Sequence, residues 1–140
     1  MILKNKKFII SAAGDGIGFS ISKLIVENGG KVYLTDIDQQ KINKINRNSK
    51  FKNKIFASQL DANNFDKVRE YFLSLSHLKK IDGLINNVGV AGPTKYIENI
   101  TKEEWQSTIE TNLNSHFFFF LFSIFFLKKN NSDFFINLSS

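Results

Sequence analysis

The 140-residue sequence contains no cysteine and a single proline, and these absences narrow its class. Without cysteine there is no disulfide framework, no thiolate metal site and no cysteine nucleophile. One proline and eight glycines are too few for a flexible linker of any length. Apolar residues make up 42% and charged residues 23%, which excludes a disordered, collagen-like or coiled-coil chain. We therefore expect residues 1–140 to form a single domain.

Arginine is also scarce, since only Arg47 and Arg69 stand among the 19 basic residues. Proteins that read nucleic acid favour arginine for bidentate contacts to bases and phosphates, so we expect no nucleic-acid partner. The net charge of +6 comes from residues 1–80, which carry 15 basic and 7 acidic side chains. Six of the basic side chains fall between Lys41 and Lys54, and we interpret this stretch as a solvated helix face and loop.

No apolar run in the sequence is long enough to cross a membrane. The longest spans residues 117–127 and would measure roughly 16 Å as a helix, against about 30 Å of bilayer hydrocarbon. Near the amino terminus, the apolar stretch that follows Lys7 ends at Ile10, which is too short for a secretory leader. We therefore expect no membrane association and, because cysteine is absent, a cytoplasmic location.

Strand and helix patterns alternate along the whole chain. Short apolar runs bounded by turn residues predict strands near 8–10, 32–34, 55–57, 81–86 and 134–138. Apolar residues at helical spacing predict helices near 17–28, 39–48, 65–75 and 101–128, with Asn63 or Asn64 as the N-cap of the third. Strands that are apolar on both faces and alternate with helices form parallel sheets. The predicted fold is α/β, a Rossmann-like doubly wound parallel sheet of about five strands with helices on both faces.

A glycine-rich turn at residues 11–18 joins the first predicted strand to the first helix. Such a turn places backbone N–H groups and a helix N-terminus against a phosphate, where side chains would obstruct the approach. The dinucleotide fingerprint G-x-G-x-x-G is not literally met, because its last position falls on Phe19 or Ile21. By itself the turn is compatible with nucleotide binding and equally with a plain tight turn.

Asp36 ends the second predicted strand, 18 residues after Gly18. An acidic side chain at this place accepts hydrogen bonds from the adenosine ribose hydroxyls and repels a 2′-phosphate, which favours NAD over NADP. Two alternatives remain open from the sequence. Asp36 could only begin the turn that follows, and Asp38 could be the ribose ligand if the strand ends later.

Five segments, in order along the chain, resemble motifs of the short-chain dehydrogenase/reductase family. The turn at 11–18 is similar to T-G-x-x-x-G-I-G, with serine for threonine and Ala12 for the first glycine. Residues 86–89 resemble N-N-A-G, and the other three segments are 61–62, 110–114 and 136–140. The resemblance implies NAD as cofactor, held by Ser11, Ala13, Asp15, Gly16, Ile17, Gly18, Asp36, Ile37, Asp61, Ala62, Asn87 and Gly89.

The same resemblance implies an oxidoreductase that interconverts a small-molecule alcohol and ketone. In the family a tyrosine with a neighbouring lysine is the general acid/base, a serine steadies the substrate oxygen and a helix asparagine holds a water. Asn112 takes the asparagine role and Ser140 the serine role. None of Tyr33, Tyr71 and Tyr96 has a lysine four residues on, so we expect a fragment without the catalytic tyrosine and lysine. The alternative is a non-catalytic nucleotide-binding pseudoenzyme or interaction module.

The second half of the last predicted helix is apolar nearly all round. We expect one side of it to face the sheet, formed by Leu113, Phe117, Phe120, Ile124 and Leu127. A helix of this kind is normally buried on every side, and family members cover it with partner subunits, so a homo-oligomer is expected. His116 lies beside four phenylalanines and is interpreted as a packed side chain, because neither it nor His77 has metal-ligand spacing.

Overall fold

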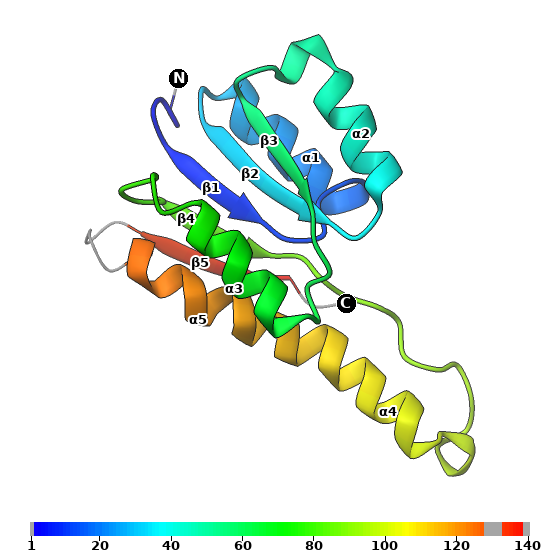
Figure 1. Ribbon diagram of the computed structural model, residues 1–140. Helices are drawn as coiled ribbons and strands as arrows, with labels where there is room; N and C mark the ends of the chain where they lie inside the picture. Colours follow the sequence, from blue (N-terminus) through cyan, green and yellow to red (C-terminus); the bar gives the residue numbers. More distant parts are fainter. Residues whose placement is uncertain (1, 128–132, 139–140) are drawn as a thin grey trace.

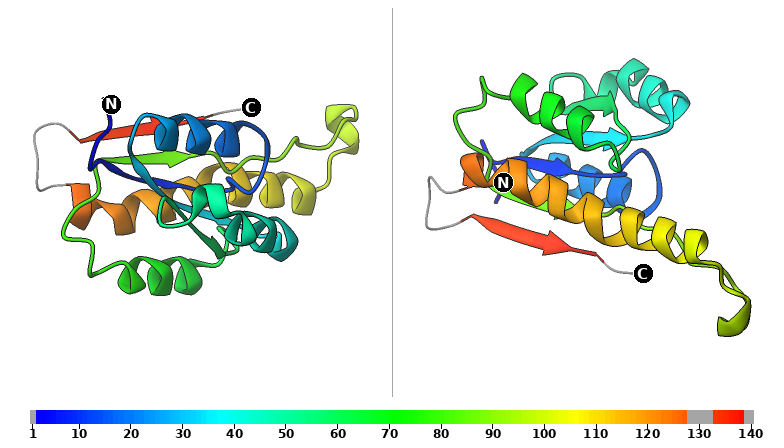
Figure 2. Two further views of the ribbon diagram at one scale, coloured as in Figure 1. Left: turned by 90° about the horizontal axis from the view of Figure 1, so that it is seen from above. Right: turned by 60° about the horizontal axis from the view of Figure 1, so that its bottom comes forward.

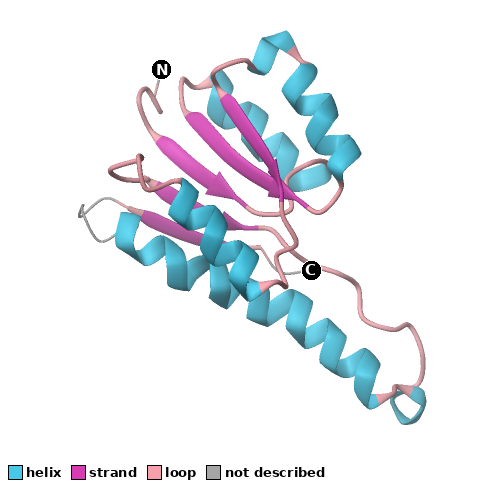
Figure 3. Cartoon of the chain, in the orientation of Figure 1, coloured by secondary structure: helices cyan, strands magenta, loops and turns pink. Residues whose placement is uncertain are grey.

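A computed structural model describes residues 2–127 and 133–138. The predicted end of the last helix at 128 lies outside these ranges, as do Ser139 and Ser140. The described strands form one sheet in the order β3-β2-β1-β4-β5, and every neighbouring pair is parallel (Figures 1 and 3). The strands are β1 (Lys7–Ile10), β2 (Lys31–Asp36), β3 (Ile55–Gln59), β4 (Gly83–Asn86) and β5 (Phe134–Asn137). The predicted Rossmann-like doubly wound sheet is confirmed.

The helices connect these strands in the alternation that the sequence predicts. They are α1 (Gly16–Glu27), α2 (Gln39–Arg47), α3 (Phe65–Ser74), α4 (Lys102–Ile109) and α5 (Ser115–Leu127). Short turns of helix are η1 (Ser49–Phe51), η2 (Ile97–Asn99) and the π-helical turn η3 (Glu110–Asn114), which joins α4 to α5. Within the described ranges, no helix is both long and apolar enough to cross a bilayer.

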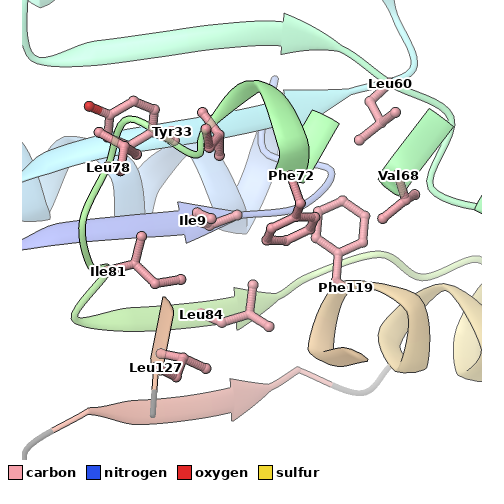
Figure 4. Close-up of a cluster of buried hydrophobic side chains, with 11 residues drawn as sticks. Ile9, Tyr33, Leu60, Val68, Phe72, Leu78, Ile81, Leu84, Phe119 and Leu127 are labelled. Carbon is pink, nitrogen blue, oxygen red and sulfur yellow. The ribbon is translucent and has the colours of Figure 1, made fainter. Parts of the chain in front are cut away.

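The two faces of the sheet carry separate hydrophobic clusters. Ile9 points to the face covered by α3 and α5, whereas Phe8 and Ile10 point to the face covered by α1 and α2, as the two-residue period of a strand requires. On the first face Phe72 of α3 packs edge-on against Phe119 of α5, with ring centroids 5.6 Å apart (Figure 4). Burial on both faces explains the continuous apolar runs of β1, β2 and β4, whereas the residues of β5 are exposed at the edge of the sheet.

Polar side chains fix where the helices begin. Asn64 caps α3 by accepting from the N–H of Lys67, which decides between the two predicted caps. Thr101 and Glu104 form the reciprocal capping box of α4. Asp38 caps α2 through the N–H groups of Gln40 and Lys41. Because β2 ends at Asp36, Asp38 does not stand at the end of the strand, and its carboxylate caps α2 instead.

The predicted buried side of the last helix is wrong except at Leu127, which is buried. Leu113 and Phe117 are 60% and 55% exposed, and the side that faces the sheet carries Ser115, Phe119 and Ser123 together with Leu127. Small serines let the helix axis lie close to the sheet while one phenylalanine fills the space beside Phe72. When a helix is apolar on every side, its sequence does not indicate which side is buried. Packing against the sheet and α3 then determines the buried side.

Candidate functional site

The carboxyl ends of β1 and β4 lie side by side at the point where the strand order reverses, and β2 ends beside them (Figure 1). In open α/β sheets this is where ligands bind. The turn after β1 leads straight into the N-terminus of α1, whose N–H groups lack partners within the helix. The backbone therefore presents amide donors at the place where the sequence predicts a phosphate.

Asp36 lies directly against this turn. Its Oδ2 accepts a 2.8 Å hydrogen bond from the N–H of Gly14, and its Oδ1 accepts one of 3.0 Å from the N–H of Asp38. The side chain belongs to a residue only 7% exposed. The predicted proximity of the acid to the glycine turn is thus present. The turn-forming alternative is present as well, because the same carboxylate also holds the backbone at 38.

The turn itself is held by Asn87, the residue that follows β4. Ser11 Oγ accepts from the N–H of Asn87 at 3.0 Å, and Asn87 Nδ2 donates to the carbonyl of Ala12 at 2.8 Å. A Cβ at Gly18 would lie 2.5 Å from Asn87 Nδ2, so glycine is required there. Ser11 and Ala13, both expected to hold cofactor, are fully buried. Their side chains shape the turn and present no surface to a ligand.

Ala12 adopts a φ of 49°, in the left-handed region. The motif that this segment resembles has glycine at this position, and a side chain there costs about 1 kcal/mol. Ala12 therefore keeps the turn at a modest energetic cost. By contrast, a Cβ at Gly16 would meet no atom within 4 Å, which leaves open space above the start of α1.

Three clefts meet around these residues. A cleft of about 440 Å³, called here the turn cleft, is lined by Ala12, Asp15, Gly16, Asp36, Lys41 and Asn87, among others. A second of about 260 Å³, the β3 cleft, lies between Asp36, Ile37, Asp61, Ala62, Gly89 and Thr111. A third of about 230 Å³, the α1–α2 cleft, is lined by Gly14, Asp15, Phe19, Lys41, Lys44 and Phe51. All of the predicted cofactor residues that are not buried line the turn cleft or the β3 cleft.

Asn112 lies in η3 and reaches the loop that follows β4. Its Oδ1 accepts from the N–H of Val90 at 2.8 Å, and its Nδ2 donates to the carbonyl of Val90 at 2.9 Å. Both ends of the amide thus contact the backbone of the loop and position it, and each end keeps one further hydrogen bond to make, so the expected role in holding a water stays a prediction. Ser140, the other expected catalytic residue, lies outside the described residues.

A polar network behind β4 was not visible in the sequence. His116 Nε2 lies 2.7 Å from the carbonyl oxygen of Val88, which confirms the prediction of a packed histidine. Asn86 Nδ2 donates both to the carbonyl of His116 and to Oδ1 of Asn137, at 3.1 Å each. These contacts tie β4, β5 and the helix together. Only the pairing of distant segments reveals them, because neither asparagine stands at a distinctive spacing from His116.

Neither Tyr33 nor Tyr71 provides a base. Burial raises the pKa of Tyr71 well above its ordinary value and also raises that of Tyr33, the reverse of what a general base needs. Both pack in the cluster beneath α3, away from the three clefts. Among the described residues, no group of histidine or carboxylate side chains forms a metal site.

A sequence model of the family described as short chain dehydrogenase matches residues 6–140. The chain belongs to this family. It is 31% identical over 117 residues to the 3-oxoacyl-[acyl-carrier-protein] reductase FabG of Chlamydia muridarum, covering 81% of this chain and 47% of that protein. It is 29% identical over 105 residues to the NADP-dependent 3-hydroxy acid dehydrogenase YdfG of Salmonella typhi, covering 74% of this chain and 42% of that protein. The chain thus spans about half the length, or less, of these two relatives.

Among solved structures, the fold matches that of ElxO with NADP bound at a TM-score of 0.88 and 22% identity. The match covers 97% of this chain and 56% of that one. Short-chain dehydrogenases bind an NAD(P) nucleotide, and the described residues fit such a group. The open space over Gly16, the helix N-terminus and the carboxylate of Asp36 provide room, amide donors and an acceptor in one place.

Proposed function

We propose that this chain is the cofactor-binding part of an NAD-dependent short-chain dehydrogenase/reductase that interconverts an alcohol and a ketone. The observation that carries the proposal is the hydrogen bond from Gly14 to Asp36, which brings the acid at the end of β2 to the turn before α1. Family membership supports the reaction class. The identity of the alcohol or ketone depends on surfaces beyond these contacts and is proposed only as a class.

The residues act on the cofactor in three ways. The pyrophosphate binds at the N-terminus of α1, where the N–H of Ile17 is a donor, because the N–H of Gly16 already donates to Oδ1 of Asp15. Asp36 accepts from the ribose hydroxyls, because each of its oxygens keeps a lone pair beyond the backbone N–H that it already accepts. Asp61 and Ala62 line the β3 cleft, where the adenine ring lies.

A negative carboxylate beside the ribose repels a 2′-phosphate, so Asp36 favours NAD over NADP. The related Salmonella dehydrogenase is named as NADP-dependent, so both cofactors belong in the test. When bound, the nicotinamide ring supplies or accepts the hydride. Asn112 holds the loop after β4 at the edge of the site, and the hydroxyl of Ser140 hydrogen-bonds the substrate oxygen in our proposal.

The direct test is a titration of the purified chain with NADH, followed by cofactor fluorescence and by calorimetry. We expect saturable binding that the variant Asp36→Ala weakens at least tenfold, because the ribose loses a charged acceptor. Asp66→Ala is the matched control, since that carboxylate is exposed on α3, where it forms an ion pair with Arg69. An absence of binding at millimolar NADH would refute the proposal. Binding without turnover of any alcohol or ketone would favour the non-catalytic module that the sequence leaves open.

We also propose that copies of this chain associate through the outer side of α4 and α5. Together α4, η3 and α5 form one continuous helical segment, which projects beyond the sheet in Figure 2. It exposes large apolar side chains, namely Trp105, Leu113, Phe117, Leu121 and Phe125. Exposed apolar surface of this extent marks an interaction site. Sedimentation should show a concentration-dependent oligomer that Phe117→Glu dissociates, and a monomer at all concentrations would contradict this part of the proposal.

A further inference from the structure

The loop that follows β4 is held in place by side chains of the last helical segment. Residues 88–90 belong to no strand or helix, and among the described residues no backbone–backbone hydrogen bond reaches them. Asn112 of η3 binds the N–H and the carbonyl of Val90, and His116 of α5 contacts the carbonyl of Val88. Two side chains four positions apart in the helical segment therefore fix both ends of this loop.

His116 contacts the chain on each side of Asn87. Its Nε2 lies 2.7 Å from the carbonyl oxygen of Val88, and its own carbonyl accepts from Nδ2 of Asn86 at 3.1 Å. A carbonyl oxygen can only accept, so Nε2 of His116 carries the hydrogen. Val88 is buried, and a buried carbonyl that loses its donor costs free energy. The imidazole ring therefore determines how the peptide group between residues 88 and 89 is oriented.

Gly89 lies between the two residues that the helical segment holds. It is exposed and lines both the turn cleft and the β3 cleft, where we place the dinucleotide in our proposal. A peptide group is planar and trans, so the N–H of Gly89 points away from the ring that binds the carbonyl of Val88. Among the described residues, no backbone carbonyl accepts from this N–H. It is therefore a donor that a ligand in the clefts can use.

We propose that His116 is a positioning residue for the cofactor, because its ring sets the direction in which the N–H of Gly89 is presented to the dinucleotide. The inference rests on the proposed function, since it needs the nucleotide to lie against Gly89. His116 lines none of the three clefts, so it acts through the loop and takes no part in the reaction. A histidine that only fills space would not need a hydrogen-bond donor at this place.

The test replaces the ring by one side chain that donates and by one that does not. Calorimetry measures the dissociation constant of NADH for the unaltered chain, His116→Gln and His116→Leu, and urea unfolding measures the stability of each. Glutamine keeps an N–H donor at a similar reach, so we expect its affinity within about twofold of the unaltered chain. Leucine fills the space without donating, and we expect roughly fivefold to tenfold weaker binding.

His77→Leu is the matched control. Nδ1 of His77 also lies close to a backbone carbonyl oxygen, 3.1 Å from that of Ser74, but the residue is exposed and lines none of the clefts. We expect its affinity for NADH to stay within twofold. An equal loss in His77→Leu and His116→Leu would overturn the assignment of His116.

Nitrogen NMR of the unaltered chain tests the contact without any substitution. We expect the neutral ring of His116 to be the Nε2–H tautomer and NADH to shift the amide signal of Gly89. The Nδ1–H tautomer would overturn the inference, because a bare Nε2 cannot donate to Val88.

Two further outcomes separate this inference from the proposed function. Unchanged NADH binding in His116→Leu, or equal weakening by both His116 variants, would overturn the inference and leave the proposed function standing. An absence of NADH binding by the unaltered chain would refute the proposed function and the inference with it.

Discussion

The N–H of Gly14 donates to Oδ2 of Asp36 at 2.8 Å, and a Cβ on Gly14 would lie 2.7 Å from that same oxygen. The turn after β1 and the end of β2 are therefore in contact with no space for a methyl group. Neither position can change without moving the other. This contact holds the acceptor for the ribose and the amides for the phosphates in one rigid unit.

Gly14→Ala should destabilise the fold and weaken cofactor binding together. The added methyl group overlaps the carboxylate of Asp36, and relieving the overlap costs about 1–3 kcal/mol. Urea unfolding gives the free energy, and an NADH titration gives the affinity. Gly92→Ala is the control, because a Cβ there lies 3.5 Å from its nearest neighbour on Thr108 and should change either quantity little. Equal effects of the two variants would contradict the contact.

Asp15→Asn should strengthen cofactor binding. The carboxylate of Asp15 hydrogen-bonds the N–H of Gly16, at the place proposed for the pyrophosphate, and adds repulsion there. Asparagine keeps the cap of α1, so the fold is retained. We expect about threefold to tenfold tighter NADH binding at low salt and a smaller gain at high salt. Glu98→Gln removes the same charge from an exposed site in η2 and should leave the affinity unchanged.

Asp82 should give the fold a stability that is lost in acid. Burial raises its pKa, but hydrogen bonds from Lys6, the N–H of Lys7 and Lys80 outweigh burial and hold the pKa below its ordinary value. Because the pKa of Asp82 is lower in the folded protein than in the unfolded chain, its ionised form stabilises the fold. This contribution is fully present at a pH above the unfolded pKa of about 4, and it is lost as the pH falls through the folded pKa.

Asp82→Asn should therefore lower the free energy of unfolding at pH 7 by roughly 1–3 kcal/mol and flatten its decline below about pH 4. Urea unfolding at a series of pH values measures both effects. Asp66→Asn alters an exposed ion pair on α3 and serves as the control, with an expected change of less than about 1 kcal/mol. An unchanged acid profile in Asp82→Asn would show that the ion pairs and hydrogen bonds of this buried carboxylate do not contribute.

Phe119→Ala and Phe125→Ala should separate the two sides of α5. Phe119 is 0% exposed against Phe72, so its truncation leaves a cavity and costs about 3–5 kcal/mol. Phe125 is 73% exposed, and its truncation should change the stability of a single chain by less than about 0.5 kcal/mol. Thermal unfolding of dilute protein distinguishes them. A larger loss for Phe125 would place the sheet on the other side of the helix.

Much of the fold follows from local patterns. The five strands follow because runs such as 32–34 are apolar on both faces, α3 follows from apolar residues at helical spacing, and the start of α4 follows from the capping box at Thr101. The nearness of Asp36 to the glycine turn also follows, since carboxyl ends of adjacent parallel strands share one edge. These features depend on residue types at fixed spacing and on general rules of sheet topology.

Other features escaped the sequence for physical reasons. The buried side of α5 was mispredicted because every side of that helix is apolar. Ser11 was expected at the ligand, yet its hydroxyl is turned inward to the N–H of Asn87, 76 positions along the chain. The side-chain amide of Asn112 likewise hydrogen-bonds the backbone of Val90, a residue 22 positions earlier in the chain. Lys41 was interpreted as part of a solvated face, since its place between two clefts depends on how α1 and α2 pack.

The amino-acid order alone determined the alternation of strands and helices, the parallel sheet and the positions of the glycine turn and of Asp36, because these depend on periodicity and on the stereochemistry of neighbouring residues. The tertiary structure alone decided which side of α5 is buried. It also decided which polar groups form hydrogen bonds within the fold and which remain facing the clefts. The reason is that burial and hydrogen-bond pairing are properties of segments far apart in the chain, and they have no local signature.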